Sequence, residues 1–426
     1  MRKTIPLIAA LLLAPRFVTA IAPYAGPGGL PRVAQLAGWV ELTDPQLKQT
    51  WDLTRNAPLL PGDRLTLADH ARLAIRLDGG ARLLATGPAT LEIASVAMRK
   101  DAPLLRLKRG ELLVESGELP LRIASDYGAV EIAAESRALL FLGGNGVDLT
   151  VLRGEAKRIP PANAPPGDHA QRLRAGEAVN LAIGKIAPLD SVWRDAAESL
   201  TAWAAPRSSS GHARDPRLDA WLAATLPPGM ENDLSDLDGA GEWRAREGGG
   251  WGWFPARTPA GWQPFSDGGW RWTRLGLFWI PDEPWGWLPY RYGTWRNSPS
   301  EGWYWLPDEQ FGGAAVVFYQ VGAMVGWAPA QQDASGGWSP AGPLLFPADG
   351  ADFYARHPAL ERVAPGELAS FIARRFPAPE TPRKSVPAEG TGVNPKPRHH
   401  PPDINPPAPQ RRLEIAPPKN GKPAED

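Results

Sequence analysis

Short alternations of apolar and polar residues fill the first half of the chain. Between residues 33 and 187, apolar side chains recur at every second position in short bursts. This is the period of a β-strand, in which successive side chains point to opposite faces. The bursts include Leu73/Ile75/Leu77, Leu91/Ile93, Leu105/Leu107, Leu112/Val114, Leu121/Ile123, Val130/Ile132, Val147/Leu149/Val151 and Val179/Leu181/Ile183. The pattern predicts many short strands, as in a sandwich, a barrel or a solenoid.

Turn-forming residues lie between these apolar bursts. Glycine favours turns because it adopts positive φ angles, and aspartate because its side chain bonds to the nearby backbone. The expected turns are Pro61-Gly62-Asp63, Asp78-Gly79-Gly80, Lys108-Arg109-Gly110, Gly143–Gly146 and Ala175-Gly176-Glu177. Residues 33–187 are therefore predicted to form an all-β domain.

A second pattern dominates residues 229–345, where tryptophan takes the place of aliphatic residues. The stretch from Trp243 to Trp338 holds fourteen of the nineteen tryptophans, with glycine and proline every few residues. Four pairs have the spacing Trp-x-Trp, at 251/253, 270/272, 285/287 and 303/305. Residues two apart share one face of a strand but diverge on a helix. Longer sequence copies recur after 25 or 26 residues, which predicts a Trp-rich domain of repeated β units.

These tryptophans have two interpretations, a packed core or a platform for a ligand. Each indole buries roughly 200 Å², and a fully exposed tryptophan face would promote aggregation, so the core is favoured. Both interpretations hold if one face packs and the other stays open. We expect pairs such as Trp285/Trp287 to pack inward. An open groove is expected to use some of the candidate ligand-binding residues Tyr290, Arg291, Tyr292, Trp295, Arg296 and Trp303.

Three segments outside the β domains have other patterns. Residues 188–226 are predicted to form a helical connector, because apolar residues recur at helical spacing and Pro216 suits a first helical position after Asp215. A short helical segment is expected at 346–376. Residues 377–426 hold fourteen prolines and almost no apolar clusters, which is typical of a disordered, polyproline-like tail.

The ordered turn motifs of residues 33–187 resemble the periplasmic domain of the FecR family of sigma-regulator proteins. The matching pieces are Leu60–Asp63, Leu77–Gly80, Leu107–Leu112, Val151–Glu155 and Leu173–Glu177. Where the family usually carries Gly-Thr, this chain has Glu135-Ser136-Arg137. FecR-type sensors also carry a cytoplasmic anti-sigma segment and a membrane helix, which we do not expect here. The resemblance therefore implies the fold and not the signalling.

The Trp-rich stretch carries a more specific resemblance. The run Glu283–Trp295, followed by Gly302–Pro307 and Val325–Trp327, resembles a bacterial Trp-rich domain of unknown function. That domain occurs in exported proteins, often after a FecR-like domain. The resemblance implies the architecture of the chain and leaves its activity open.

The N-terminus has the pattern of a secretory signal peptide. Basic residues precede a short apolar run, Ile5 to Ala14, and small residues follow up to Ala20. The run is too short for a membrane-spanning helix, which needs about 20 apolar residues. We therefore expect a signal peptide at residues 1–20, no membrane span after cleavage, and a periplasmic or secreted protein.

Composition limits the chemistry that the chain can perform. It contains no cysteine, which excludes disulfides, thiol catalysis and cysteine metal ligands. Basic and acidic residues both total 46, and this neutral balance argues against a nucleic-acid partner. No cofactor-binding or hydrolase motif occurs, and His399-His400 is only a weak metal signal. No catalytic, cofactor or metal residue is assigned.

Two acidic pairs, Asp282/Glu283 and Asp308/Glu309, are the best candidates for acid–base chemistry. They occupy matching positions of two sequence copies, beside tryptophans, and glycosidases use paired carboxylates. A turn that occurs in both sequence copies explains these pairs better, since aspartate favours turns. The two carboxylates of a catalytic pair need different environments, and matching positions do not suggest a difference.

We therefore expect a non-enzymatic binding or scaffold protein of the bacterial envelope. Its expected partner is a glycan such as peptidoglycan, or an envelope protein, bound through the Trp-rich domain. The alternatives are a regulatory FecR-type sensor without the cytoplasmic part, and a glycan-active hydrolase.

Overall fold

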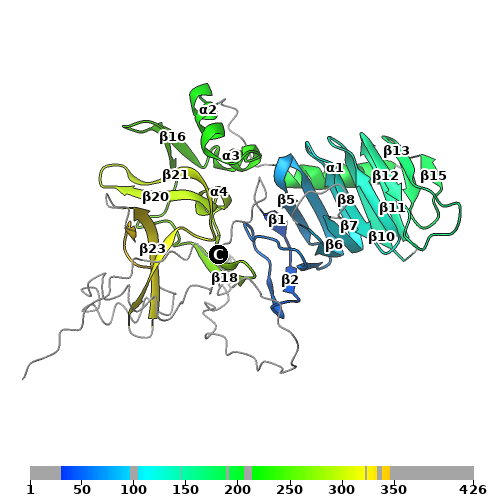
Figure 1. Ribbon diagram of the computed structural model, residues 1–426, viewed down its shortest axis with the longest axis horizontal. Coiled ribbons are helices and arrows are strands. Elements are labelled where there is room, and N and C mark those ends of the chain that lie inside the picture. Colours follow the sequence, from blue (N-terminus) through cyan, green and yellow to red (C-terminus); the bar gives the residue numbers. More distant parts are fainter. Residues whose placement is uncertain are drawn as a thin grey trace, which may run out of the picture.

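The computed structural model describes residues 30–95, 104–144, 146–188, 191–205, 214–321, 324–332 and 338–345. The predicted fold class is confirmed, because the chain is mainly β with few short helices. Two regions lie side by side along the long axis in Figure 1: the N-terminal β region (residues 30–188) and the Trp-rich region (residues 214–345). The predicted signal peptide, the segment 346–376 and the tail 377–426 fall outside the described residues.

One sheet of fifteen strands forms the N-terminal β region. Its main order is β13-β12-β9-β8-β7-β10-β11-β14-β15, and β6 connects β7 to β4 and β5. The strands are β1 (Arg32–Ala37), β2 (Val40–Asp44), β3 (Gln49–Asp52), β4 (Arg64–Leu67), β5 (Arg72–Arg76), β6 (Arg82–Ile93), β7 (Leu105–Glu115), β8 (Leu121–Ser125), β9 (Gly128–Ile132), β10 (Arg137–Gly143), β11 (Gly146–Arg153), β12 (Glu155–Ile159), β13 (Gln171–Arg174), β14 (Glu177–Asn180) and β15 (Ile186–Pro188). The alternating apolar residues of these strands, from Val33 to Leu181, meet in one continuous core.

The expected turn at Lys108-Arg109-Gly110 is wrong. These residues lie inside β7, which pairs with β6 on both sides of a register shift. Gly110 has a φ of 93°, and a Cβ there would lie 2.5 Å from the Pro88 carbonyl oxygen. The glycine is needed where the two long strands approach closely, because no side chain fits there. The chain continues through it without reversing.

Helix α1 (Ser191–Ala204) covers one face of the large sheet. Its Ala197 and Leu200 pack against Ala74, Leu84, Leu113 and Leu139 of the sheet. The first predicted helix of the connector therefore braces the N-terminal β region.

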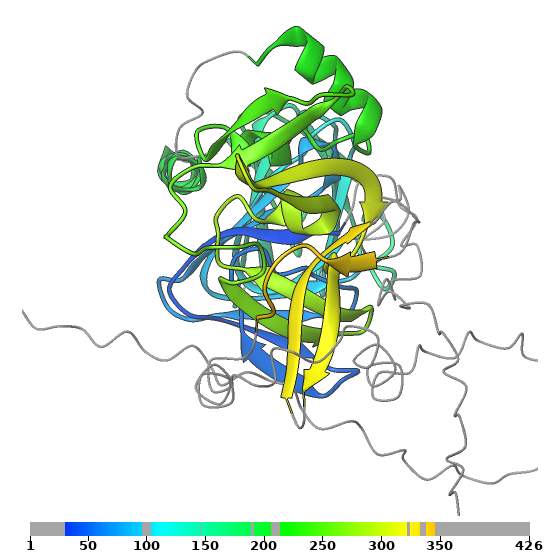
Figure 2. The ribbon, with the colours of Figure 1, turned by 90° about the vertical axis from the view of Figure 1, so that its left-hand side faces the viewer.

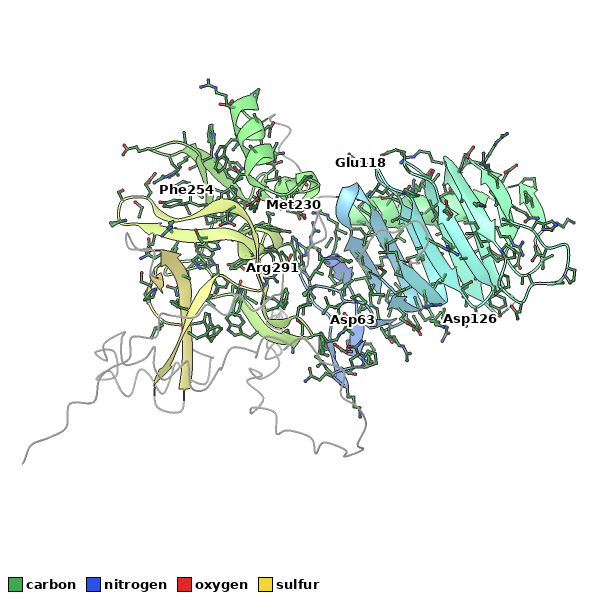
Figure 3. The ribbon with its side chains drawn as sticks, viewed as in Figure 1. Asp63, Glu118, Asp126, Met230, Phe254 and Arg291 are labelled. Carbon is green, nitrogen blue, oxygen red and sulfur yellow. The ribbon has the colours of Figure 1, made fainter. Side chains whose placement is uncertain are left out.

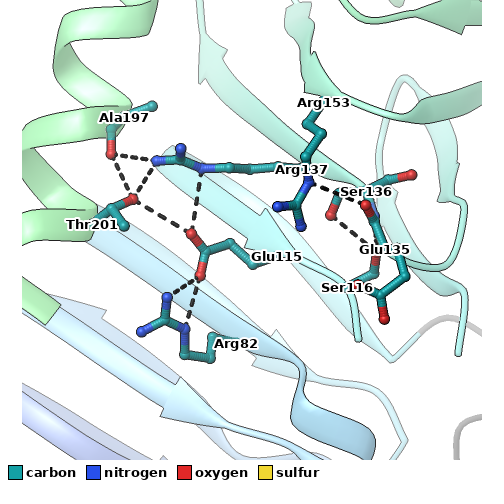
Figure 4. A network of polar contacts seen from close by, with 9 residues as sticks. All are labelled: Arg82, Glu115, Ser116, Glu135, Ser136, Arg137, Arg153, Ala197 and Thr201. Carbon is teal, nitrogen blue, oxygen red and sulfur yellow. Dashed lines mark hydrogen bonds and ion pairs between the residues drawn. The ribbon is translucent and has the colours of Figure 1, made fainter. Parts of the chain in front are cut away.

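A polar network beside α1 involves the segment that departs from the FecR pattern (Figure 4). Arg137 donates to the Ala197 carbonyl oxygen at 2.9 Å and pairs with Glu115 at 3.3 Å. Arg82 binds the other oxygen of Glu115 at 2.8 Å, and the Ser136 amide donates to the Ser116 hydroxyl at 2.8 Å. Arg137 thus ties the helix to β7 and β10, while Ser136 closes the neighbouring turn.

Small antiparallel sheets and three short helices make up the Trp-rich region. The sheets have the orders β16-β17-β21-β20, β18-β19 and β22-β23-β24. The elements are α2 (Pro216–Thr225), α3 (Glu231–Leu237), β16 (Gly241–Ala245), β17 (Trp251–Pro255), β18 (Gly268–Thr273), β19 (Gly276–Pro281), α4 (Trp287–Arg291), β20 (Tyr292–Ser298), β21 (Gly302–Phe311), β22 (Val316–Val321), β23 (Met324–Gln332) and β24 (Trp338–Pro340). Figure 2 shows these elements in front of the large sheet.

Local sequence signals explain most of these elements. The Asp215 side chain accepts a hydrogen bond from the Arg217 amide at 2.8 Å, with Pro216 at the first position, as expected for α2. Three of the four Trp-x-Trp pairs lie in strands β17, β18 and β21. The fourth does not, because Trp287 begins α4 and Trp285 precedes it.

The two regions meet at a buried junction. Leu30 and Leu60 pack with Phe278, Ile280 and Trp287. The guanidinium groups of Arg32 and Arg291 lie 5.1 and 5.0 Å from the centre of the Trp287 ring. Their exposed fractions are only 4% and 2%, and Arg32 forms an ion pair with Asp233 of α3.

A second contact extends the junction along the hairpin β18–β19. Arg274, at the tip of the hairpin, donates to Asp44 Oδ2 at 2.8 Å, to Asp63 Oδ1 at 2.5 Å, and to the Pro61 carbonyl oxygen. Burial raises the pKa of Asp63 to about 6, although the Leu60 amide and the Arg274 charge act in the opposite direction. The tip of the hairpin is therefore held by buried, charge-assisted hydrogen bonds.

We predict that Arg274→Ala destabilises the protein by about 3–5 kcal/mol, because it leaves two buried carboxylates without their cation. The measurement is denaturant unfolding at neutral pH. Arg217→Ala is the control, since Arg217 is 91% exposed and a surface ion pair contributes about 0–1 kcal/mol. Equal effects of the two substitutions would contradict the junction as described.

Candidate functional site

Four tryptophans form a row across one face of the four-stranded sheet. Trp243 lies opposite Trp253, Trp253 opposite Trp305, and Trp305 opposite Trp295. Trp253, Trp295 and Trp305 are fully buried, with exposed fractions of 0 to 1%. This face of the sheet is therefore core.

The indole rings of this core pack edge to face. Trp253 lies 4.8 Å from Trp285 at 61°, and Trp270 lies 5.6 Å from Trp327 at 89°. This geometry brings the positive edge of one ring to the negative face of another. Trp305 and Trp327 donate their N–H groups to the carbonyl oxygens of Tyr292 and Phe265. Tryptophan thus fills the volume that aliphatic residues fill in the N-terminal β region.

The structure does not gather the six candidate ligand-binding residues in an open groove. Tyr290, Arg291, Tyr292 and Trp295 are at most 2% exposed, so the expectation of an open groove is wrong for these four. Figure 3 shows Arg291 near the junction. The inward packing expected of Trp285 and Trp287 is found, at 8% and 2% exposure.

The remaining two candidates, Arg296 and Trp303, are partly exposed. In the pairing of β20 with β21, Arg296 lies opposite Tyr304, and Trp303 lies opposite Asn297. Successive residues of a strand point to opposite faces, so Arg296 and Trp303 belong to different faces. Only Arg296 lies on the face away from the tryptophan row.

That second face, here called the outer face, carries its own row of side chains. Glu242 lies opposite Phe254, and Tyr304 lies opposite Arg296. The Phe254 and Tyr304 rings stack across the strands with centroids 5.1 Å apart and planes at 23°. Phe254 lies toward the outer end of the Trp-rich region, away from the junction (Figure 3).

Two arginines cover the aromatic pair of the outer face. The guanidinium of Arg244 lies 4.2 Å from the centre of the Phe254 ring, and that of Arg246 lies 4.3 Å from Tyr304. Arg246 also binds Glu301 at 2.7 Å, and this hydrogen bond raises the pKa of the guanidinium. The outer face therefore combines flat rings with donors and acceptors, a combination that sequence spacing did not single out.

A buried carboxyl group lies on the tryptophan side of the sheet. Glu283 is 8% exposed, and its Oε1 accepts from Trp262 Nε1 at 3.0 Å and from Tyr290 Oη at 2.9 Å. Its Oε2 is buried without a hydrogen-bond partner among the described residues. Burial raises the pKa of Glu283 to about 7, although both donors lower it. Burial also raises the pKa of Tyr290, and the neighbouring Glu283 adds to this shift.

The two acidic pairs found in the sequence are not equivalent. Asp282 and Glu283 follow the end of β19, whereas Asp308 and Glu309 lie inside β21. Glu309 is exposed, while Glu283 is buried. The expected shared turn is therefore wrong, and the two sequence copies fold differently at this point.

The described residues contain neither a metal-ligand cluster nor a membrane-spanning helix. No group of three or more histidine, aspartate or glutamate residues in these ranges could hold a metal ion. None of the described helices is long and apolar enough to cross a membrane.

Comparisons with known proteins found one family model and solved structures of one other protein that are similar to this chain. Residues 234–334 match a family of unknown function, DUF6600, in agreement with the resemblance of the Trp-rich stretch. Two crystal structures of a candidate anti-sigma factor from Parabacteroides distasonis are similar at 14% and 13% identity, covering 43% and 45% of this chain and 95% and 98% of theirs. Their TM-score of 0.25 is too low to support a functional assignment. No curated protein matches the chain.

We predict that Trp295→Ala destabilises the protein by about 3–5 kcal/mol, the usual cost of truncating a buried aromatic residue. Trp39→Ala is the control, because Trp39 is 48% exposed and should cost less than about 1 kcal/mol. Chemical unfolding followed by circular dichroism measures both. Similar small losses for the two variants would show that Trp295 is not core.

We also predict that the stability of the folded chain depends on the ionisation of Glu283. The folded pKa, about 7, lies above the ordinary 4.5. The neutral carboxyl group of Glu283 therefore favours the folded state. This contribution to the free energy of unfolding is complete below pH 4.5 and is lost as the pH rises through 7, by at most about 1.4 kcal/mol per pH unit. Glu283→Gln should remove this dependence from unfolding curves recorded between pH 4.5 and 8. Glu309→Gln, at an exposed position, should retain the pH dependence. Identical pH profiles for both variants would contradict the raised pKa of Glu283 in the folded chain.

Proposed function

We propose that this chain is an exported, non-enzymatic binding protein of the bacterial envelope, and that its outer face holds a glycan such as peptidoglycan. The stacked pair Phe254 and Tyr304, flanked by Arg244, Arg246 and Arg296, is the observation that carries the proposal. Phe254 is only 5% exposed, so the partly exposed Tyr304 and the flat guanidinium groups over both rings provide the surface that stacks on the apolar face of a sugar ring. Arginine donors and carboxylate acceptors match the sugar hydroxyl and acetamido groups.

The location of the outer face supports binding rather than core packing. Arg244 and Glu242 are exposed at the edge strand β16, and Tyr304 in the neighbouring β21 is partly exposed. The opposite face of the same sheet is anchored by the tryptophan row. A ligand would therefore meet preorganised side chains on a supported sheet, which lowers the ordering cost of binding.

The N-terminal β region fits the role of a scaffold in this proposal. Its buried junction with the Trp-rich region holds the two regions in one orientation. The FecR resemblance of residues 33–187 remains an interpretation of the sequence, as do export and a periplasmic or secreted location. A FecR-type sensor and a glycan-active hydrolase are the competing functions, and a protein partner is the competing ligand.

The experiment is cosedimentation of the full chain, without its signal peptide, with purified peptidoglycan. We predict that the wild type cosediments and that Tyr304→Ala weakens binding by about 1–3 kcal/mol, with the base–aromatic stacking value standing in for sugars. Arg296→Ala should weaken binding without a comparable loss of melting temperature.

The control variant is Trp39→Ala, which removes an exposed aromatic side chain of the N-terminal β region and should bind as the wild type does. If the wild type does not cosediment with peptidoglycan, the proposed glycan ligand is wrong, and a protein partner becomes the leading candidate. Release of soluble fragments from the peptidoglycan would favour the hydrolase.

A further inference from the structure

Strand β16 forms an accessible edge of the four-stranded sheet. Among the described strands it pairs with β17 alone, and Figure 1 shows it on the side of the Trp-rich region away from the N-terminal β region. Glu242 and Arg244 on its outer face are exposed, and so is Ala245 on the opposite face. An exposed edge presents backbone N–H and C=O groups that another strand can bind.

The pairing of β16 with β17 decides which of its backbone groups point away from the sheet. The Ala256 amide donates to the Ala240 carbonyl oxygen at 2.8 Å, and the Arg246 amide donates to the Gly250 carbonyl oxygen at 3.0 Å. Hydrogen-bonded and non-hydrogen-bonded pairs alternate in an antiparallel ladder. The even-numbered residues of β16 therefore bond to β17, and the backbone groups of the odd-numbered residues point outward.

Trp243 is the central odd-numbered residue of this strand. Gly241 also forms an isolated bridge with Asp238, so the outward groups of Trp243 and Ala245 are the ones that no described strand takes. The Trp243 ring packs on Trp305 with centroids 5.8 Å apart and is partly exposed. The edge is thus anchored to the core at its middle residue.

The charges of β16 are complementary to those of a second copy of the same strand. Antiparallel pairing about a two-fold axis at Trp243 places this residue opposite its own counterpart. Each Glu242 then faces Arg244 of the second copy, and each Arg244 faces Glu242 of the second copy. Opposite charges and aromatic pairs at directly facing positions stabilise a sheet. Edges that resist pairing usually carry lysine or proline, and β16 carries neither.

We propose that two copies of this chain pair through β16 across a two-fold axis at Trp243. The same residues point outward in both copies, so the hydrogen-bonding pattern and the charges select the same register. The two four-stranded sheets then become continuous, and the outer face of each copy gains Glu242 and Arg244 of the other. The contact itself needs no ligand.

The consequence of this contact for binding rests on the proposed function. Two outer faces on one continuous sheet would hold a glycan polymer at two points. Linked sites bind more tightly than either site alone, because the second binding event is intramolecular.

The first test is sedimentation velocity of the full chain, without its signal peptide, over a range of concentrations. We expect the mean mass to rise from that of one chain toward twice that value. One short edge buries less than the roughly 1,600 Å² of a standard interface, so the association should be weak and reversible.

The second test is hydrogen exchange of the backbone amides, which reports the register. The Trp243 amide should exchange about tenfold more slowly when about nine-tenths of the chains are paired than in dilute solution, because only the unpaired chain exposes it. The Arg244 amide, which bonds to β17, should be protected at both concentrations.

Exchange of the two charges separates this contact from general association. Glu242→Arg and Arg244→Glu each place like charges at both facing positions and should keep the chain monomeric. The double substitution restores opposite charges, and an equimolar mixture of the two single variants does so between chains, so both should associate. Glu118→Arg, at an exposed position of the N-terminal β region, is the control and should associate as the wild type does.

Three results would overturn the proposal. The first is a monomeric wild type at every concentration. The second is equal weakening of association by Glu242→Arg and Glu118→Arg. The third is a folded double variant that stays monomeric. A wild type that associates in the expected register but does not cosediment with peptidoglycan would support the contact and overturn the glycan ligand alone.

Discussion

The burial of Arg32 and Arg291 against Trp287 is the interaction on which the arrangement of the chain depends. Two guanidinium groups lie within about 5 Å of one indole ring, in an interior where an uncompensated charge is costly. Arg32 is compensated by Asp233. Arg291 donates to the carbonyl oxygens of Trp279, Tyr290 and Gly313. Burial lowers the pKa of Arg291 to about 9, so it remains charged at neutral pH. The Trp287 ring thus joins the two regions and fixes α4 against β19.

The four-stranded sheet divides its aromatic residues between two roles by strand alternation. One face, with Trp253, Trp295 and Trp305, supplies the core, and the other carries Phe254 and Tyr304 under arginine side chains. A region of small sheets has few aliphatic residues to bury, and tryptophan offers a large apolar area with one donor. The abundance of tryptophan is therefore explained by packing. The proposed binding surface depends on residues that a count of tryptophans does not reveal.

Features set by local sequence could be predicted, whereas those set by distant contacts could not. Strand alternation indicated the β class and the core from Val33 to Leu181, and Asp215-Pro216 indicated the start of α2. Gly110 looked like a turn because a close approach between strands needs the same residue. Trp295 looked like a platform residue because its burial depends on β21 and on Trp253. Glu283 and Glu309 share a sequence motif but lie in different surroundings. The backbone carbonyl oxygen of Glu283 accepts a hydrogen bond from the Asn56 side chain, which is 227 positions earlier in the chain. No local pattern contains such a contact.

Hydrogen exchange of the indole N–H groups tests the central claim, that the tryptophan row is core, most directly. The measurement is nuclear magnetic resonance of the chain with 15N-labelled tryptophan after transfer to deuterated buffer. The account predicts slow exchange for Trp253, Trp295 and Trp305, which are fully buried, and fast exchange for Trp39, which is 48% exposed. Exchange of Trp295 and Trp305 at the rate of Trp39 would contradict the account and restore the open tryptophan platform.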